Sequence, residues 1–356
     1  MVFTLAVTIS IANLEILSKK IYARRQTLIL FLASLFLAFG SIEACIRIAD
    51  PLGISYYKEA SRYHLEKIAA PELVYRHRPS WQTTYQGVEV RFNEHGLRDN
   101  TIQPKSRSEY RILVLGDSLT FGWGVAQGEI FTLRLQQMLA AKLRRPIRVV
   151  NTGVGSYNTV QQYTYLEKEG LSLDPDLVLL VYVSNDIEIN EGLFDPWSAR
   201  AFKDKSAPQV LLMLLWKSWL YRLVNHVYQY GSSRVSPGTS YDSVKGSQGW
   251  KASIGALKNI VDVSHNYGIP LVIFYFRWQA TPFESALLED VRTTVAPIPV
   301  EDISKWFANK QLHRYINSKV DSHPNSEGHK VIAENIASYL LHKNFFARIT
   351  RHNSSD

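Results

Sequence analysis

Apolar residues in the second two-thirds of the chain gather in short, continuous runs that are rich in β-branched residues. A continuous apolar run is typical of a strand covered on both faces, as in a parallel sheet, whereas a strand with one wet face alternates. The pattern therefore predicts five strands, at 111–116, 147–153, 177–184, 269–276 and 296–300.

Helical spacing of apolar residues fills the intervals between these runs. The segment 131–143 carries leucines and a methionine three or four residues apart, and 250–268 ends on Gly268, a residue suited to a helix C-terminus. A further helical pattern starts near Asn325. Alternating strands and helices predict a doubly wound, three-layer α/β/α domain with a mostly parallel, flavodoxin-like, five-stranded sheet, whose ligand site lies beyond the C-terminal ends of the strands.

A different apolar pattern lies near the N-terminus. Residues 27–42 are almost free of charge, and the run reaches residue 48 only if Glu43 and Arg47 are included. A membrane-spanning helix needs roughly 20 largely apolar residues. The basic residues sit on one side of the run, which predicts a signal anchor with a cytoplasmic N-terminus and an extracytoplasmic remainder; they are Lys19, Lys20, Arg24 and Arg25.

Three alternatives to a signal anchor stay open. A cleaved signal peptide would need small residues at the cleavage site, where Ile42 and Glu43 intrude. A lipid-modified Cys45 would likewise be preceded by an ill-fitting Glu43. The run could also be a buried core helix.

If the run is an anchor, the sequence predicts four parts. Residues 1–48 form a cytoplasmic lead and the transmembrane helix, and residues 49–108 form a linker with a short strand at 88–92. Residues 109–346 form the α/β domain, with a helical insertion at 187–248, and residues 347–356 form a C-terminal tail.

The role of the insertion has two interpretations. Its apolar segment 209–230 is consistent with a helical hairpin that caps the fold, or with a lid beside the site. The unbroken apolar part, 210–216, is too short to span a bilayer.

Charge and cysteine content exclude several classes. The chain carries a formal charge of +8, but no run of Lys and Arg is longer than a pair, so nucleic-acid binding is not expected. Cys45 is the single cysteine, which excludes an intramolecular disulfide and a multi-cysteine zinc site. His, Asp and Glu show no metal-ligand spacing, so neither a metal nor another cofactor is predicted.

Candidate chemistry begins directly after the first strand, at "GDSLTFG" (116–122). A serine at the start of a helix has a hydroxyl facing the crevice and a backbone N–H that can point at an anion, so Ser118 is a candidate acyl-transfer nucleophile. The segment lacks the Gly-Lys-Ser/Thr ending of a phosphate-binding loop and the Gly-x-Ser-x-Gly spacing of a nucleophile elbow.

Complementary groups follow later strands. His323 in "DSHPN" is a candidate base, with Asp321 near enough to orient its ring. An oxyanion hole needs donors, and Gly155 or Ser156 in "NTGVGSYNT" and Asn185 in "VSND" supply them. The serine, the glycine block and Asn185 follow the C-terminal ends of strands, so these signals converge on one edge of the sheet.

In these four blocks and their order the sequence resembles the SGNH (GDSL-type) hydrolases, over roughly 111–341. The preceding "FNEHGLRDN" is similar to a lead-in of membrane-anchored bacterial members. Counting from the start of its block, the family's oxyanion glycine falls on Ser156, so the donor is open between Gly155 and Ser156. Val183 replaces the leading glycine of the third block, and the usual Asp-x-x-His is here Asp321-x-His323.

The resemblance implies a membrane-anchored, extracytoplasmic serine esterase whose substrate is a small-molecule or glycan ester. The same residues would serve an O-acyltransferase or deacetylase of cell-envelope glycans, and a non-catalytic binding protein that keeps the fold is a third hypothesis. Trp123 and 275–283 either line the substrate pocket or pack in the core, and His329 is expected to pack against or cap the last helix.

Overall fold

A computed structural model of the chain describes residues 2–189, 215, 217–231 and 240–346. They fall into two compact units. The N-terminal unit comprises 1–54 and 206–232, and the α/β unit comprises 55–205 and 233–356. Parts of the predicted insertion (190–214, 216 and 232–239) and the predicted tail lie outside the described residues.

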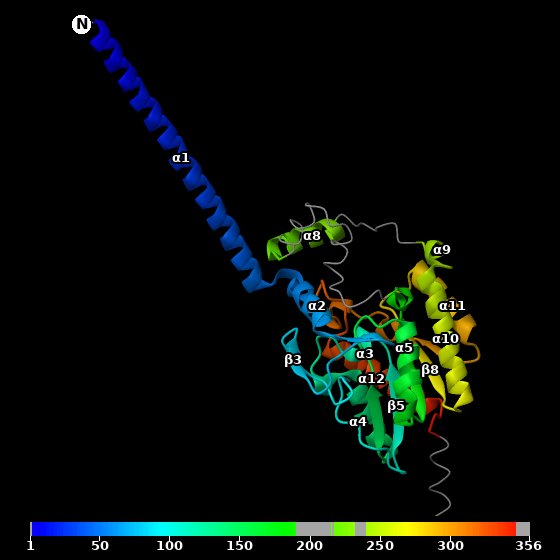
Figure 1. The fold of residues 1–356 in the computed structure, drawn as a ribbon. Coiled ribbons are helices and arrows are strands. Elements are labelled where there is room, and N and C mark those ends of the chain that lie inside the picture. The colour runs from blue at the N-terminus through cyan, green and yellow to red at the C-terminus, as the bar shows by residue number, and fades with distance from the viewer. Residues whose placement is uncertain (1, 190–214, 216, 232–239, 347–356) are drawn as a thin grey trace, which may run out of the picture. The chain divides into compact units, whose positions relative to one another are not determined.

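The α/β unit is built on a parallel five-stranded sheet in the order β6-β5-β7-β8-β9 (Figure 1). This is the strand order of flavodoxin-like folds, which confirms the predicted fold class. The strands are β5 (Tyr110–Leu115), β6 (Ile147–Asn151), β7 (Leu177–Val183), β8 (Leu271–Phe276) and β9 (Val300–Asp302).

Only the fifth strand is displaced from its predicted place, 296–300. Pro297 and Pro299 fall in that range and have no N–H to donate to a ladder. Pro299 instead contributes its carbonyl, which accepts a hydrogen bond of 3.0 Å from the Ile273 backbone N–H, and regular pairing begins at Val300.

Helices cover both faces of the sheet, and the alternating side chains of β5 show why. Ile112 and Val114 face one core with α4 (Phe131–Leu143) and α12 (Ser326–His342). Leu113 and Leu115 face the opposite core with α5 (Thr159–Tyr165), α10 (Gln248–Asn266) and α11 (Pro282–Val295). Because the β5 side chains from Ile112 to Leu115 are buried on both faces, this part of the strand needs apolar residues at every position. Two short helices complete this unit, α3 (Ser118–Phe121) and α9 (Tyr241–Val244).

Residues 55–108 are not the linker that the sequence suggested. They form a helix and two antiparallel hairpins, and they belong to the α/β unit. The sequence predicts only the last of these strands, which covers 88–91 of the predicted 88–92. The elements are α2 (Ser55–Glu66), β1 (Ile68–Ala70), β2 (Val74–Arg76), β3 (Gln82–Tyr85) and β4 (Val88–Arg91).

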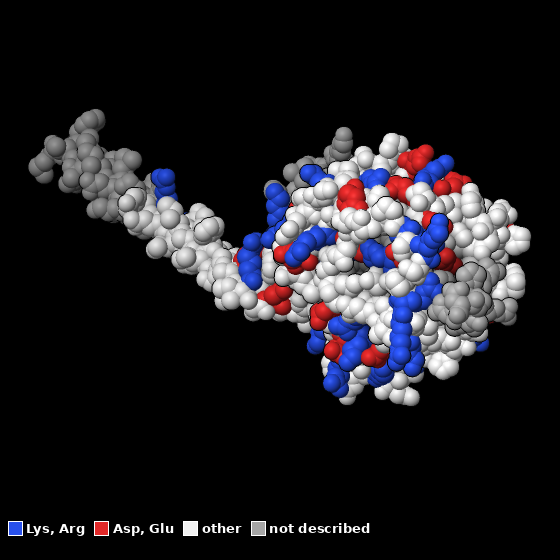
Figure 2. Space-filling view, turned by 90° about the horizontal axis from the view of Figure 1, so that it is seen from below, with Lys and Arg blue, Asp and Glu red and all other residues white. Residues whose placement is uncertain are grey.

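The N-terminal unit contains α1 (Val2–Ala49) and α8 (Trp219–Gly231). Within α1 the segment Arg24–Ala49 is long and apolar enough to cross a membrane, and only 6% of its most apolar window is buried. Its described surface is almost free of charged side chains (Figure 2). Length and composition thus make α1 a candidate membrane anchor or signal sequence.

Candidate active site

The serine corner follows β5 directly. Asp117 caps α3, because its Oδ1 accepts a hydrogen bond of 2.9 Å from the Leu119 backbone N–H. A Cβ atom at Gly116 would lie 2.1 Å from Thr120 Oγ1, so the turn leaves no room for a larger residue. Ser118 is partly exposed among buried neighbours, which leaves its hydroxyl accessible from outside the sheet.

At this corner Ser118 meets two predicted residues, Asp321 and His323, that lie about two hundred positions later in the chain. Ser118 Oγ lies 2.8 Å from His323 Nε2, and His323 Nδ1 lies 2.5 Å from Asp321 Oδ1. Asp321 is 1% exposed, so its carboxylate has little water to compete with the imidazole. An Nδ1–H donated to Asp321 leaves Nε2 as the acceptor for the serine proton.

The loop that carries His323 is held by side chains that sequence analysis missed. Asn317 Nδ2 donates to Asp321 Oδ2 at 3.1 Å and to the Trp123 carbonyl at 3.0 Å. Trp278, from the segment expected near the pocket, donates through Nε1 to the Ser322 carbonyl at 2.9 Å. Asn317 stands in a polar loop with no motif around it, so no sequence signal distinguishes it.

Electrostatics favour a more basic imidazole at position 323. Burial lowers the pKa of His323, but the Asp321 carboxylate, through charge and hydrogen bond, and the more distant Asp117 raise it, and the net pKa lies above the ordinary value. His323 is therefore a stronger base than a free histidine.

The predicted glycine block packs directly on the serine corner. Asn151 Nδ2 donates to the Thr120 carbonyl at 2.8 Å, and Asn151 Oδ1 accepts from the Gly153 N–H at 2.9 Å. A Cβ atom at Gly153 would lie 2.2 Å from the Phe121 backbone nitrogen. The two loops thus touch backbone to backbone.

The two candidate oxyanion residues of this block have different surroundings. The Gly155 N–H donates to the Tyr63 hydroxyl at 2.7 Å, and Lys67 Nζ donates to the Gly155 carbonyl at 2.5 Å. Ser156 has a φ of 64°, in the left-handed region that favours glycine, and its carbonyl accepts from the Tyr75 hydroxyl at 2.8 Å. The backbone at 156 thus has the conformation expected where the family has glycine.

Asn185 reaches the same corner from the end of β7. Its Nδ2 lies 3.4 Å from Asp117 Oδ2, an oxygen that is also 3.2 Å from Ser118 Oγ. The buried Asp186 fixes the turn by accepting hydrogen bonds from the Val183 N–H and from Gln162 Nε2. Burial raises the pKa of the Asp186 carboxyl well above its usual range.

Two aromatic side chains lie beside His323: Trp123, which the sequence analysis singled out, and Tyr56 of α2, which it did not. The ring centroid of Tyr56 lies 6.2 Å from that of His323, and that of Trp123 lies 6.4 Å from it. Trp123 is 3% exposed and belongs to a buried aromatic cluster, and it borders the His323 imidazole at the same time.

The lead-in segment "FNEHGLRDN" (92–100) supports the site from behind. The fully buried Arg98 donates to the carbonyls of Phe121, Gly122 and Val125, at and just after the C-terminal end of α3. Burial lowers the pKa of Arg98 to about 9. Asp99 Oδ2 accepts from the Asn151 N–H at 2.8 Å and thereby anchors the glycine block.

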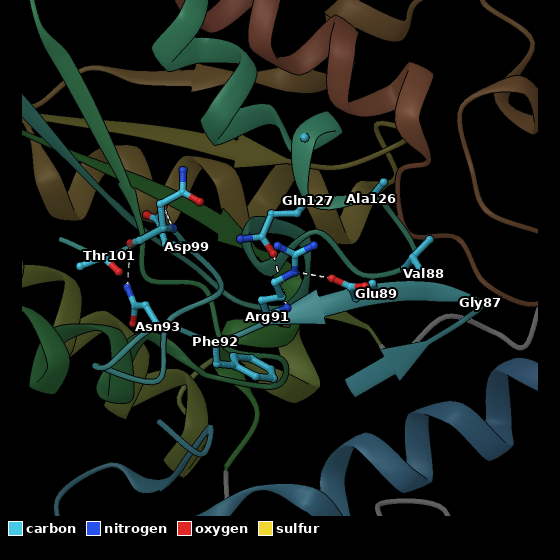
Figure 3. A pocket seen from close by; sticks show the side chains of 12 residues that line it. Gly87, Val88, Glu89, Arg91, Phe92, Asn93, Asp99, Thr101, Ala126 and Gln127 are labelled. Atoms are coloured by element: carbon cyan, nitrogen blue, oxygen red, sulfur yellow. Dashed lines mark hydrogen bonds and ion pairs between the residues drawn. The ribbon is translucent and has the colours of Figure 1, made fainter. Parts of the chain in front are cut away.

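The outer side of this segment borders a polar cleft (Figure 3). Asn93, Asp99 and Thr101 line it together with Arg91 of β4 and Gln127. None of the predicted site residues is among its lining residues. Among the residues that the structure describes, no group of three or more His, Cys, Asp or Glu side chains could hold a metal ion.

His329 lies apart from this chemistry. It is fully buried, and its Nδ1 accepts a hydrogen bond of 3.2 Å from the Phe131 N–H at the start of α4. Burial lowers the pKa of His329 to about 3, so the ring is neutral and links α12 to α4.

Solved structures with related folds include several ester-cleaving proteins at low identity. A lipase/acylhydrolase from Enterococcus faecalis is 14% identical, with 65% of this chain and 95% of that chain covered and a TM-score of 0.41. The esterase EstA from Pseudoalteromonas sp. is 14% identical, with 64% and 94% covered and a TM-score of 0.39. A two-domain esterase active on acetylated mannans is 13% identical, with 66% of this chain and 49% of that chain covered and a TM-score of 0.41.

A search of the curated proteins gives no match. The family model of the GDSL-like lipases and acylhydrolases, in contrast, matches residues 114–331, from the end of β5 into α12. That match covers more than half of the chain and spans all the predicted site residues. The protein is thus a carboxylic ester hydrolase and belongs to the GDSL-like lipase/acylhydrolase family.

Proposed function

We propose that Ser118 is the nucleophile, His323 the general base and acid, and Asp321 the residue that orients the imidazole. The observation that carries this assignment is the unbroken path from Asp321 Oδ1 through His323 to Ser118 Oγ, with contacts of 2.5 and 2.8 Å. These distances are those expected of a nucleophile in contact with its base.

In the proposed reaction Ser118 Oγ attacks the ester carbonyl carbon while His323 Nε2 takes the serine proton. The tetrahedral intermediate collapses, the bond to the alcohol oxygen breaks, and His323 returns the proton to that oxygen. Water then attacks the carbonyl carbon of the acyl-serine while His323 Nε2 takes a proton from the water. The second tetrahedral intermediate collapses, the bond between the acyl carbon and Ser118 Oγ breaks, His323 returns its proton to Ser118 Oγ, and the carboxylic acid leaves.

For the oxyanion hole we assign the backbone N–H groups of Ser118 and Ser156 and the side-chain amide of Asn185. Gly155 is the weaker candidate because its N–H already donates to Tyr63. The left-handed backbone at Ser156 supports its choice. The shared contact with Asp117 Oδ2 supports Asn185, since it brings the amide beside the serine hydroxyl.

We place the catalytic unit outside the cytoplasm, anchored by α1. The apolar segment Arg24–Ala49 and the basic residues before it support this orientation. A C-terminal tag on the full-length chain should be removed by protease added to intact spheroplasts. A tag that is cleaved only after lysis would contradict this placement.

The decisive experiment on the chemistry is labelling of the full-length protein in detergent with a fluorophosphonate probe, which reacts with activated serines. The wild type should label, whereas Ser118→Ala and His323→Ala should lose the label. Ser338→Ala, at an exposed position of α12, is the matched control and should label fully. A folded wild type that stays unlabelled would contradict the proposed mechanism.

A further inference from the structure

Helix α8 carries an apolar stripe that is partly open to solvent. Leu220, Leu223, Val224 and Val227 recur at helical spacing on one side. The two leucines are half-buried and the two valines are exposed. Val224 is 58% exposed and Val227 53% exposed, although the burial of two valines would favour folding. Arg222 and Asn225 lie on the opposite side of the same helix.

A carboxylate of α1 fixes the start of α8. Glu43 accepts hydrogen bonds from the Ser218 hydroxyl at 2.8 Å and from the backbone N–H groups of Trp219 and Leu220 at 2.9 Å each. These N–H groups are among those that a helix leaves unpaired at its first turn. Glu43 therefore acts as an N-cap supplied by another helix.

Arg47 strengthens this attachment. Its Nε donates to Glu43 Oε1 at 2.8 Å, and its guanidinium lies 5.8 Å from the centroid of the Trp219 ring. The two charged residues that interrupt the apolar run of α1 are thus the two that hold α8.

The position of Glu43 along α1 determines how deep the start of α8 would lie in a bilayer that α1 spans. At 1.5 Å per residue, the nearly charge-free stretch from Thr27 to Glu43 is about 24 Å long, slightly less than the roughly 30 Å of a hydrocarbon core. If α1 spans a bilayer, Glu43 and the start of α8 lie where the acyl chains give way to the headgroups. Trp219 and Tyr221 are residues that are enriched at this level.

We propose that α8 is an interfacial helix whose apolar stripe inserts into the outer leaflet of the phospholipid bilayer. The inference rests on the proposed membrane anchor. In this position the exposed valines contact lipid acyl chains. No second protein is needed to cover them, because the attachment to Glu43 already places α8 at the membrane surface. The protein would then hold the membrane at two places, along α1 and along α8.

The test uses the full-length chain with Cys45→Ser, so that single cysteines can be introduced and labelled with an environment-sensitive fluorophore. The protein is reconstituted into vesicles of phosphatidylcholine and phosphatidylglycerol (3:1) that contain lipids with a nitroxide on the acyl chain. Reporters are Val227→Cys on the stripe, Asn225→Cys on the opposite face as the matched control, and Leu37→Cys on α1.

We expect the nitroxide to quench fluorescence at positions 37 and 227 at least threefold more than at 225. Strong quenching at 37 with equal quenching at 227 and 225 would overturn the interfacial helix and leave the anchor intact. An unquenched reporter at 37 would overturn the anchor and this inference with it. Retained ester hydrolysis by each labelled variant shows that the reporters leave the fold intact.

Discussion

The candidate active site has two walls that are built in different ways. The first wall lies at the edge of the sheet, and its position depends mainly on where the strands end. It consists of the serine corner, the glycine block, the Asn185 turn and the His323 loop. The wall formed by residues 55–101 is positioned by buried polar side chains such as Tyr63, Lys67 and Arg98. The described contacts of Lys67 and Arg98 are carbonyls, a histidine and aromatic faces rather than carboxylates.

Because of this difference, we expect substitutions in the two walls to change different properties of the protein. A change at the sheet edge removes a group that acts on the substrate, so it should lower turnover and leave the free energy of unfolding unchanged. A change in the second wall removes support for that edge, so it should lower stability first. Substitutions in the two walls test this contrast.

Asp321→Asn should cost the most, about 10⁴ in kcat, because the amide can neither hold the required tautomer nor stabilise the imidazolium. Protonated His323 cannot act as base, so wild-type activity should fall as the pH drops through its raised pKa. Burial lowers the pKa of His323, and in the variant no carboxylate opposes this effect at position 321. The acidic limb of the kcat/KM profile should therefore move to lower pH. The pH profile measures this shift, with the exposed Asp262→Asn as the unaffected control.

Asn185→Ala should lower kcat by roughly 10² to 10³, the usual result of losing one oxyanion donor. Its side chain is exposed, so the melting temperature should stay that of the wild type. Steady-state kinetics and a thermal scan check both statements. A variant with normal kcat would remove Asn185 from the oxyanion hole.

Arg98→Met should destabilise the protein by about 3 kcal/mol, because three buried carbonyls lose their donor. Arg91→Met is the matched control in the neighbouring strand. Arg91 is exposed and paired with Glu89, so its loss should change the free energy of unfolding by less than about 0.5 kcal/mol. Denaturant unfolding measures both. Equal, small effects would show that the second wall is not held by Arg98.

Tyr63→Phe should have the smallest effect, about 1 to 2 kcal/mol in unfolding and roughly tenfold in kcat. The hydroxyl bridges the Gly155 N–H and His77 Nε2, so its removal loosens the loop that bears Ser156. Tyr163→Phe, which loses only an exposed contact with Glu167, is the control. A loss of kcat without any loss of stability would place Tyr63 in the chemistry rather than in the support.

The sequence predicts the sheet-edge wall well because its information is local. The fully buried β5 reads as one apolar run, and the residues that follow each strand carry recognisable motifs. The fifth strand was misplaced because prolines interrupt its apolar run. Tyr63, Arg98 and Asn317 could not be found in this way. Their importance comes from partners 23 to 194 residues away, and no periodicity in the sequence indicates such contacts.

The close packing at Gly153 makes the centre of the candidate site rigid. Because its backbone abuts the backbone of Phe121, the loop that carries Ser156 and the helix that begins at Ser118 leave no space to slide past one another. The proposed nucleophile and oxyanion donors are therefore held in place before a substrate binds, so the free energy needed to align them is part of the free energy of folding. We therefore expect the choice between ester substrates to depend on the side chains around this rigid centre, such as Tyr56, and not on a movement of the two loops toward each other.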